Sequence, residues 1–146
     1  MPIFDNQSRD ELRRTYIEAW RKRRAGSPAE PLEAQIAEVI ELHPEYQAAL
    51  EQPDRVIERD YTPDDGQSNP FLHMGLHLAV RDQLATDRPP GIRQAFAVVA
   101  KRAGDGHQAE HGMIECLAET LWQAQRTGRP PDEMEYLEKV RRLARK

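Results

Sequence analysis

Apolar residues recur at intervals of three or four positions along most of the chain, which is the spacing of an amphipathic α-helix. The first stripe follows the capping signature Ser8 to Glu11 and stops before Gly26. It consists of Leu12, Tyr16, Ile17 and Trp20. Later stripes predict helices that open near residues 31, 70, 90, 106 and 131, the helix from 106 running to about 127. The periodicity therefore predicts an all-α chain.

Two features interrupt the helical pattern. Pro44 breaks or kinks the helix that opens near residue 31, and a short continuation follows it. Residues 52–69 contain Pro53, Pro63 and Gly66 and predict a long loop, a kind of connection that is often functional or mobile. We therefore expect a single domain over residues 1–146, folded as an all-α bundle of five or six helices, with the long loop at 52–69.

The composition limits the partners and the location. With 146 residues, 38% hydrophobic and 32% charged, the chain is polar but suits one domain with a modest core. The sequence contains no apolar run of membrane-spanning length and no secretory signal, and Cys116 is the single cysteine, so we expect a cytoplasmic protein. The net charge of −4 disfavours nucleic acid and acidic membranes as partners. The polar composition of this small bundle is also consistent with a homodimer.

Four of the five histidines form two pairs with the same spacing. His73 lies four residues before His77, and His107 lies four residues before His111, so each pair projects from one face of its predicted helix. Each pair also begins a stripe that is otherwise apolar. The pattern therefore predicts imidazoles that point toward the interior of the bundle or toward its edge.

Up-down connectivity predicts that the two pairs meet. The helix between them would return the chain, so the two histidine-bearing helices would run parallel with their N-termini at the same end. The first pair starts about four residues into its helix and the second about two, so their levels differ by only about 3 Å. Four imidazoles would then face one point in space.

Such a cluster is suited to a transition metal. Neutral imidazole binds zinc, iron or nickel, and a position near a helix N-terminus favours the neutral form of the ring. The leading hypothesis is therefore a metal-binding bundle with one of these ions as its cofactor. The expected ligands are His73, His77, His107 and His111. His43, which precedes Pro44, is a further ligand candidate.

Glu110 is the candidate catalytic residue. It lies one turn after His107 and completes the string His107-x-x-Glu110-His111, which also occurs in inverted zinc peptidases. Those enzymes are much larger, so the string alone does not predict a peptidase. Glu110 would act as an acid–base group or as a ligand if the metal keeps an open position for water or substrate. A closed site of four imidazoles would instead be structural or sensory.

The alternative is a non-enzymatic helical interaction module. In that case the histidines would be hydrogen-bonded core residues, as most buried histidines are. The partner surface would be the basic end of the first helix, Arg21–Arg24, or the amphipathic last helix. The sequence leaves both functions open.

Several strings of the chain resemble one known family. They are Asn69 to His77, Asp87 to Arg93, His107-x-x-Glu110-His111-x-Met113 and Trp122-x-Ala124-Gln125-Arg126. Over nearly the whole chain they resemble a small bacterial family, domain-of-unknown-function family 1841. The resemblance implies a short, stand-alone bacterial protein and brings no known activity, cofactor or substrate.

Overall fold

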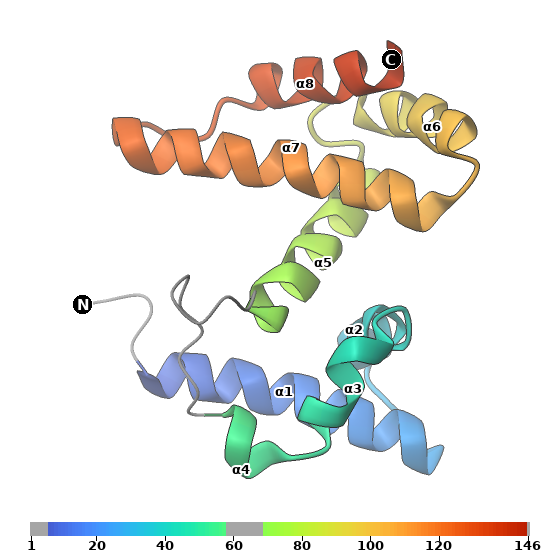
Figure 1. Ribbon diagram of the computed structural model, residues 1–146, viewed down its shortest axis with the longest axis vertical. Helices are drawn as coiled ribbons and strands as arrows, with labels where there is room; N and C mark the ends of the chain where they lie inside the picture. The colour runs from blue at the N-terminus through green and yellow to red at the C-terminus, as the bar shows by residue number, and fades with distance from the viewer. Residues whose placement is uncertain (1–5, 58–68, 146) are drawn as a thin grey trace. The chain divides into compact units, whose positions relative to one another are not determined.

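The computed structural model describes residues 6–57 and 69–145, and within these ranges every regular element is an α-helix (Figure 1). The eight helices of the described residues are α1 (Asn6–Ala25), α2 (Pro31–Glu41), α3 (Pro44–Leu50), α4 (Pro53–Val56), α5 (Pro70–Thr86), α6 (Ile92–Ala103), α7 (Gly106–Thr127) and α8 (Glu133–Arg145). The all-α class is thus confirmed. Among the described residues, none of the helices is both long enough and apolar enough to cross a membrane.

The predicted count of five or six helices is wrong, because two prolines start helices of their own. Pro44 opens α3 and Pro53 opens α4, each in the first turn, where the missing N–H of proline removes no helical hydrogen bond. Helix α4 lies inside the segment 52–69 that the sequence predicts as a loop. Of that segment, residues 58–68 lie outside the described ranges.

The chain divides into two compact units, residues 1–75 and 76–146, and the boundary falls within α5. The expected single domain stays a prediction. In the first unit α1 packs against α2, and both α3 and α4 contact α1. The buried apolar side chains of this unit are Tyr16, Ala19, Trp20, Ile36, Ala37, Val39, Ile40, Leu50, Val56, Phe71 and Met74.

Arg13 of α1 is a buried cation in the core of the first unit, with 3% of its surface exposed. Its guanidinium donates hydrogen bonds to the backbone carbonyls of Val56 and Ile57, both at 3.0 Å. The same group lies 4.9 Å from the centre of the Phe71 ring, a cation–π arrangement. Arg13 therefore ties the end of α4 to α1.

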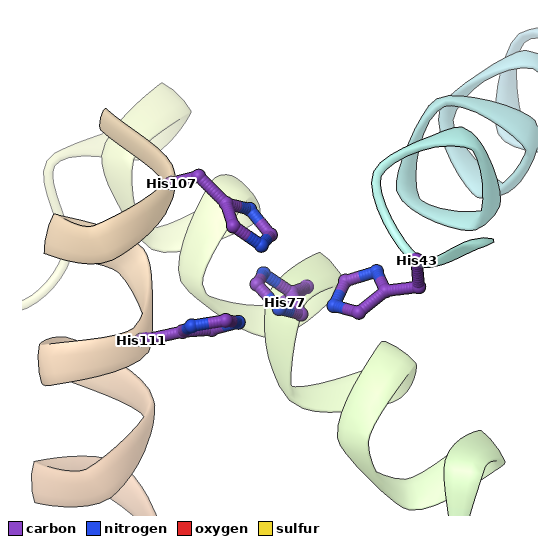
Figure 2. A group of neighbouring side chains, drawn as sticks. All are labelled: His43, His77, His107 and His111. Carbon is purple, nitrogen blue, oxygen red and sulfur yellow. The ribbon is translucent and has the colours of Figure 1, made fainter. Parts of the chain in front are cut away.

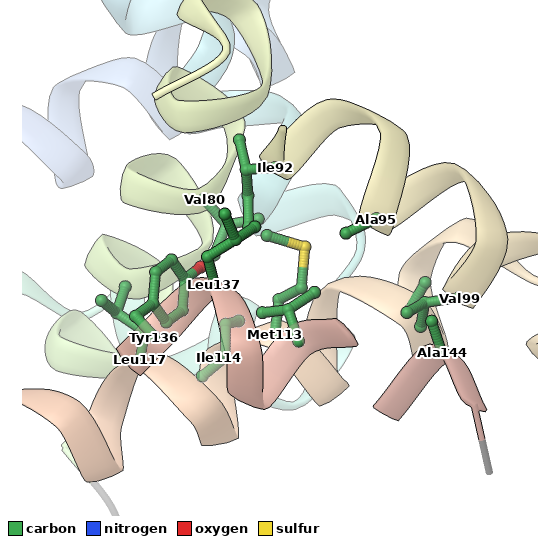
Figure 3. Close-up of a cluster of buried hydrophobic side chains, with 12 residues drawn as sticks. Val80, Ile92, Ala95, Val99, Met113, Ile114, Leu117, Tyr136, Leu137 and Ala144 are labelled. Carbon is green, nitrogen blue, oxygen red and sulfur yellow. The ribbon is translucent and has the colours of Figure 1, made fainter. Parts of the chain in front are cut away.

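In the second unit α6, α7 and α8 pack against one another, and the later half of α5 adds Val80 to their core (Figure 3). The tyrosine hydroxyl of Tyr136 in α8 donates to the side-chain oxygen of Gln83 in α5 at 2.6 Å. Gly112 marks a close approach, since a Cβ at this position would lie 2.6 Å from the Leu143 side chain of α8. The other buried apolar residues are Ile92, Ala95, Val99, Ala109, Met113, Ile114, Leu117, Leu137, Val140 and Ala144.

The string Asp87 to Arg93 covers the connection between α5 and α6 and the first two residues of α6. Asp87 has a left-handed backbone, with φ 52°, and its carboxylate accepts hydrogen bonds from the backbone N–H groups of Arg93 at 3.0 Å and Gly91 at 3.4 Å. The Arg93 guanidinium donates in return to the carbonyls of Leu84 and Ala85 at the end of α5. The start of α6 is therefore satisfied by the residue that follows α5, and the end of α5 is satisfied by a residue of α6.

Replacing Arg13 tests its role in the first unit. Arg13→Met keeps an apolar stem but removes the donors to two carbonyls. We expect the free energy of unfolding, measured by urea titration, to fall by about 2 to 3 kcal/mol, the range for losing hydrogen bonds to a charged group. Arg14→Met changes the exposed neighbour and should leave stability within about 0.5 kcal/mol of wild type. Equal losses in the two variants would contradict this assignment.

Replacing Asp87 tests the connection through its pH dependence. The hydrogen bond from the N–H of Arg93 is the main cause that lowers the pKa of Asp87 below its usual value. Charged Asp87 therefore stabilises the fold above the unfolded-state pKa of about 3.9, and this contribution is lost as the pH falls through the lower folded-state pKa.

Asp87→Asn keeps a residue that tolerates the left-handed conformation but removes the charge. We expect wild type to unfold at a higher urea concentration than Asp87→Asn at pH 7, and the gap to close as the pH falls below 4. A gap that is the same at all pH values would argue against the role of the charge.

Candidate metal centre

Three histidines of the second unit converge from two helices. His77 of α5 and His107 and His111 of α7 each offer one ring nitrogen, and these nitrogens lie within 4.8 Å of one another. The ring centroids are 5.2 Å apart for His77 and His107, 5.0 Å for His77 and His111, and 4.2 Å for His107 and His111. Figure 2, which also draws His43 of the first unit, shows the two rings of α7 extending toward His77. The cluster is the candidate site.

The start of α7 sets the position of its two histidines. Asp105 caps the helix, because its carboxylate accepts a hydrogen bond from the backbone N–H of His107 at 2.9 Å. The helix begins at Gly106, as the sequence predicts, so His107 and His111 lie on successive turns of one face. The prediction that this pair shares a face is confirmed by the 4.2 Å between the two rings.

In Figure 1 the second-unit part of α5 runs across the direction of α7, whereas the sequence predicts that the two helices run parallel. A crossing brings one turn of α5 to the first turns of α7, while parallel helices would bring two. His77 supplies that turn and is fully buried. His73 lies one turn earlier on α5, about 6 Å along the helix axis. The structure therefore brings together three of the four predicted ligands.

His73 belongs to the first unit, where it contacts a second histidine. The His73 ring forms a T-shaped pair with the His43 ring, with the centroids 5.0 Å apart, and another with the Tyr46 ring at 6.2 Å. His43 is the N-cap residue of α3 and is buried, and its ring stacks on Tyr46 at 5.3 Å. The Nδ1 atom of His43 lies 2.7 Å from the carbonyl oxygen of Val39. Because a carbonyl only accepts, this Nδ1 carries the hydrogen.

Glu110 of α7 is buried beside the three histidines, with 8% of its surface exposed. The Arg81 guanidinium donates to both carboxylate oxygens, to Oε1 at 3.0 Å and to Oε2 at 3.4 Å. The Nδ1 atom of His77 lies 3.4 Å from the same Oε1. Burial alone would raise the pKa of Glu110, but the hydrogen bonds from His77 and Arg81 and the Arg81 charge outweigh it and lower the pKa to about 2. Glu110 is therefore an ionised carboxylate at neutral pH.

The donor set fits a transition metal in number and chemistry. Ligand nitrogens of a tetrahedral zinc site lie about 3.4 Å apart, which follows from zinc–nitrogen distances of about 2.0 to 2.1 Å. The three nitrogens here lie within 4.8 Å of one another. Rotations of the side chains that move these nitrogens by on the order of 1 Å would bring them to the spacing of a zinc site. Three protein nitrogens leave at least one coordination position to another ligand.

Sequence reasoning missed Arg81. It follows His77 by four residues and therefore lies on the same helical face, between that histidine and the apolar end of the stripe. A cation at such a position indicates a buried anion nearby, since a buried charge is nearly always paired. The partner, Glu110, is 29 residues away in the chain, so the pairing itself could not be read from local spacing.

Fold and site together define an all-α protein with a cluster of histidines beside a part-buried arginine–carboxylate pair. Residues 8–142 match the domain of unknown function DUF1841, and the chain belongs to this family. The family resemblance of the sequence is thereby confirmed. No curated protein and no solved structure matches the chain significantly.

Proposed function

We propose that this protein binds a transition metal ion through His77, His107 and His111. The observation that carries the proposal is the convergence of three imidazole nitrogens, from two helices of one compact unit, to within 4.8 Å. Packing alone would be served by apolar side chains, whereas each imidazole brings two polar nitrogens into the site. Imidazole is a ligand that suits zinc, iron and nickel.

Three imidazoles describe an open site rather than a closed one. The remaining positions on the ion would take water, a substrate or a further side chain, and an open site supports metal-assisted hydrolysis or small-molecule redox chemistry. His73 as a fourth ligand stays a prediction, and so does Glu110 as an acid–base group. A cytoplasmic location and a homodimer also stay predictions.

Metal binding is tested on protein purified without a nickel column. We expect about one metal ion per chain by elemental mass spectrometry, or zinc uptake by metal-free protein. Added zinc should raise the melting temperature, because an ion that binds only the folded state stabilises it by about 2.7 kcal/mol at a hundredfold excess over Kd. His77→Ala, His107→Ala and His111→Ala should each lose this zinc effect.

Two further variants sharpen the comparison. Gln108→Ala changes an exposed neighbour of the ligands and should respond to zinc as wild type does. His73→Ala tests whether the site has three histidine ligands or four, because this substitution lowers the affinity for zinc only if His73 also binds the ion. Protein that holds no metal and whose melting temperature is unchanged by zinc, iron or nickel would overturn the proposal.

The interaction module receives less support, because both of its expected partner surfaces are occupied within their own units. Helix α8 turns its apolar face into the second-unit core. The basic residues at the end of α1 pair with carboxylates of the first unit, and such pairs at or near the surface add little stability but reduce the charge offered to a partner. The pairs are Arg21 with Glu18, Lys22 with Glu33, Arg23 with Glu41 and Arg24 with Glu51.

A further inference from the structure

We infer that Glu110, held in place by Arg81, positions His77 so that it binds the metal through Nε2. The inference rests on the proposed function, since it assigns the part of that site that orients a ligand. It makes Glu110 a positioning residue, in place of the acid–base role expected from the sequence.

The contacts with Arg81 determine the protonation of Glu110. Arg81 donates to Oε1 at 3.0 Å and to Oε2 at 3.4 Å, and a guanidinium has donors but no acceptor. Both oxygens of Glu110 therefore accept, as in the bidentate pairs that arginine forms with carboxylates. A proton on either oxygen would oppose this arrangement.

The contact with Glu110 determines the tautomer of His77. Its Nδ1 lies 3.4 Å from Oε1 of Glu110, and an ionised carboxylate can only accept a hydrogen bond. Nδ1 must therefore carry the hydrogen, and in the neutral ring the lone pair lies on Nε2. The 3.4 Å separation is long for such a bond, and an ion on Nε2 would strengthen the donation by withdrawing electron density from the ring.

The Nδ1–H tautomer leaves Nε2 of His77 available to a metal. Metal-binding histidines usually donate their second ring N–H to a carboxylate or carbonyl, which fixes the tautomer and the orientation of the ring. His77 has this carboxylate, and Arg81 keeps the carboxylate from turning toward the ion. Glu110 already accepts hydrogen bonds from the side chains of His77 and Arg81. The metal ligands are therefore the three imidazole nitrogens.

The experiment measures zinc affinity by competition with a chromophoric chelator. Glu110→Gln keeps the size of the side chain but weakens its acceptance from His77, and we expect affinity to fall about 10- to 100-fold with one ion still bound per chain. Arg81→Met leaves Glu110 in place without its clamp and should shift affinity in the same direction. Glu115→Gln changes an exposed carboxylate of the same helix and should leave affinity unchanged. Urea titration confirms that each variant is folded.

A second measurement is independent of metal binding. Long-range ¹⁵N–¹H spectra of the metal-free protein, with His77 assigned by comparison with His77→Gln, report which ring nitrogen carries the hydrogen. We expect the Nδ1–H tautomer, and after zinc addition a shift of Nε2 that marks coordination.

The outcomes separate the inference from the proposed function. Unchanged zinc affinity in Glu110→Gln, or an Nε2–H tautomer of His77, would overturn the positioning role while leaving a three-histidine site. Loss of binding as complete as in His77→Ala would make Glu110 a ligand and also overturn it. A wild-type protein that binds no zinc, iron or nickel would overturn the proposed function itself, whatever the tautomer of His77.

Discussion

The charge of Glu110 has to be compensated inside the second unit, and the contacts that do so join its helices. Removing a carboxylate from water costs several kcal/mol unless cations and hydrogen-bond donors replace the water. Arg81 and His77, both on α5, supply those donors to a carboxylate on α7. The same contacts hold α5 against the start of α7, which is where the three rings meet. Charge compensation and site geometry therefore depend on one arrangement.

The helices could be read from the sequence wherever they are long enough to show a stripe. Helix α7 runs over Gly106–Thr127, the range expected from its cap and its periodicity, because these signals are local. Helix α4 has four residues, too few for a repeat of three or four to appear. Pro44 and Pro53 carried the missing information, since a proline that ends one helix can begin the next.

The site could be predicted only as far as spacing within one helix decides it. His107 and His111 share a face because they are four residues apart, whatever the rest of the fold does. The contribution of α5 depends on the angle between two helices, which periodicity does not encode. Parallel helices would offer both His73 and His77, whereas the structure shows only that His77 joins the two histidines of α7, and His73 as a ligand stays a prediction. The role of Arg81 depends on a contact between distant segments and was not accessible to local reasoning.

The glycine beside the last of the three rings has a consequence for how the protein is handled. Because Gly112 has no side chain, Leu143 of α8 rests against the backbone of α7 one residue after His111. Helix α8 therefore packs directly against the part of α7 that carries His107 and His111. A shortened fragment that stops before residue 143 would lack this contact, so the smallest piece worth preparing for spectroscopy extends into the last turn of α8.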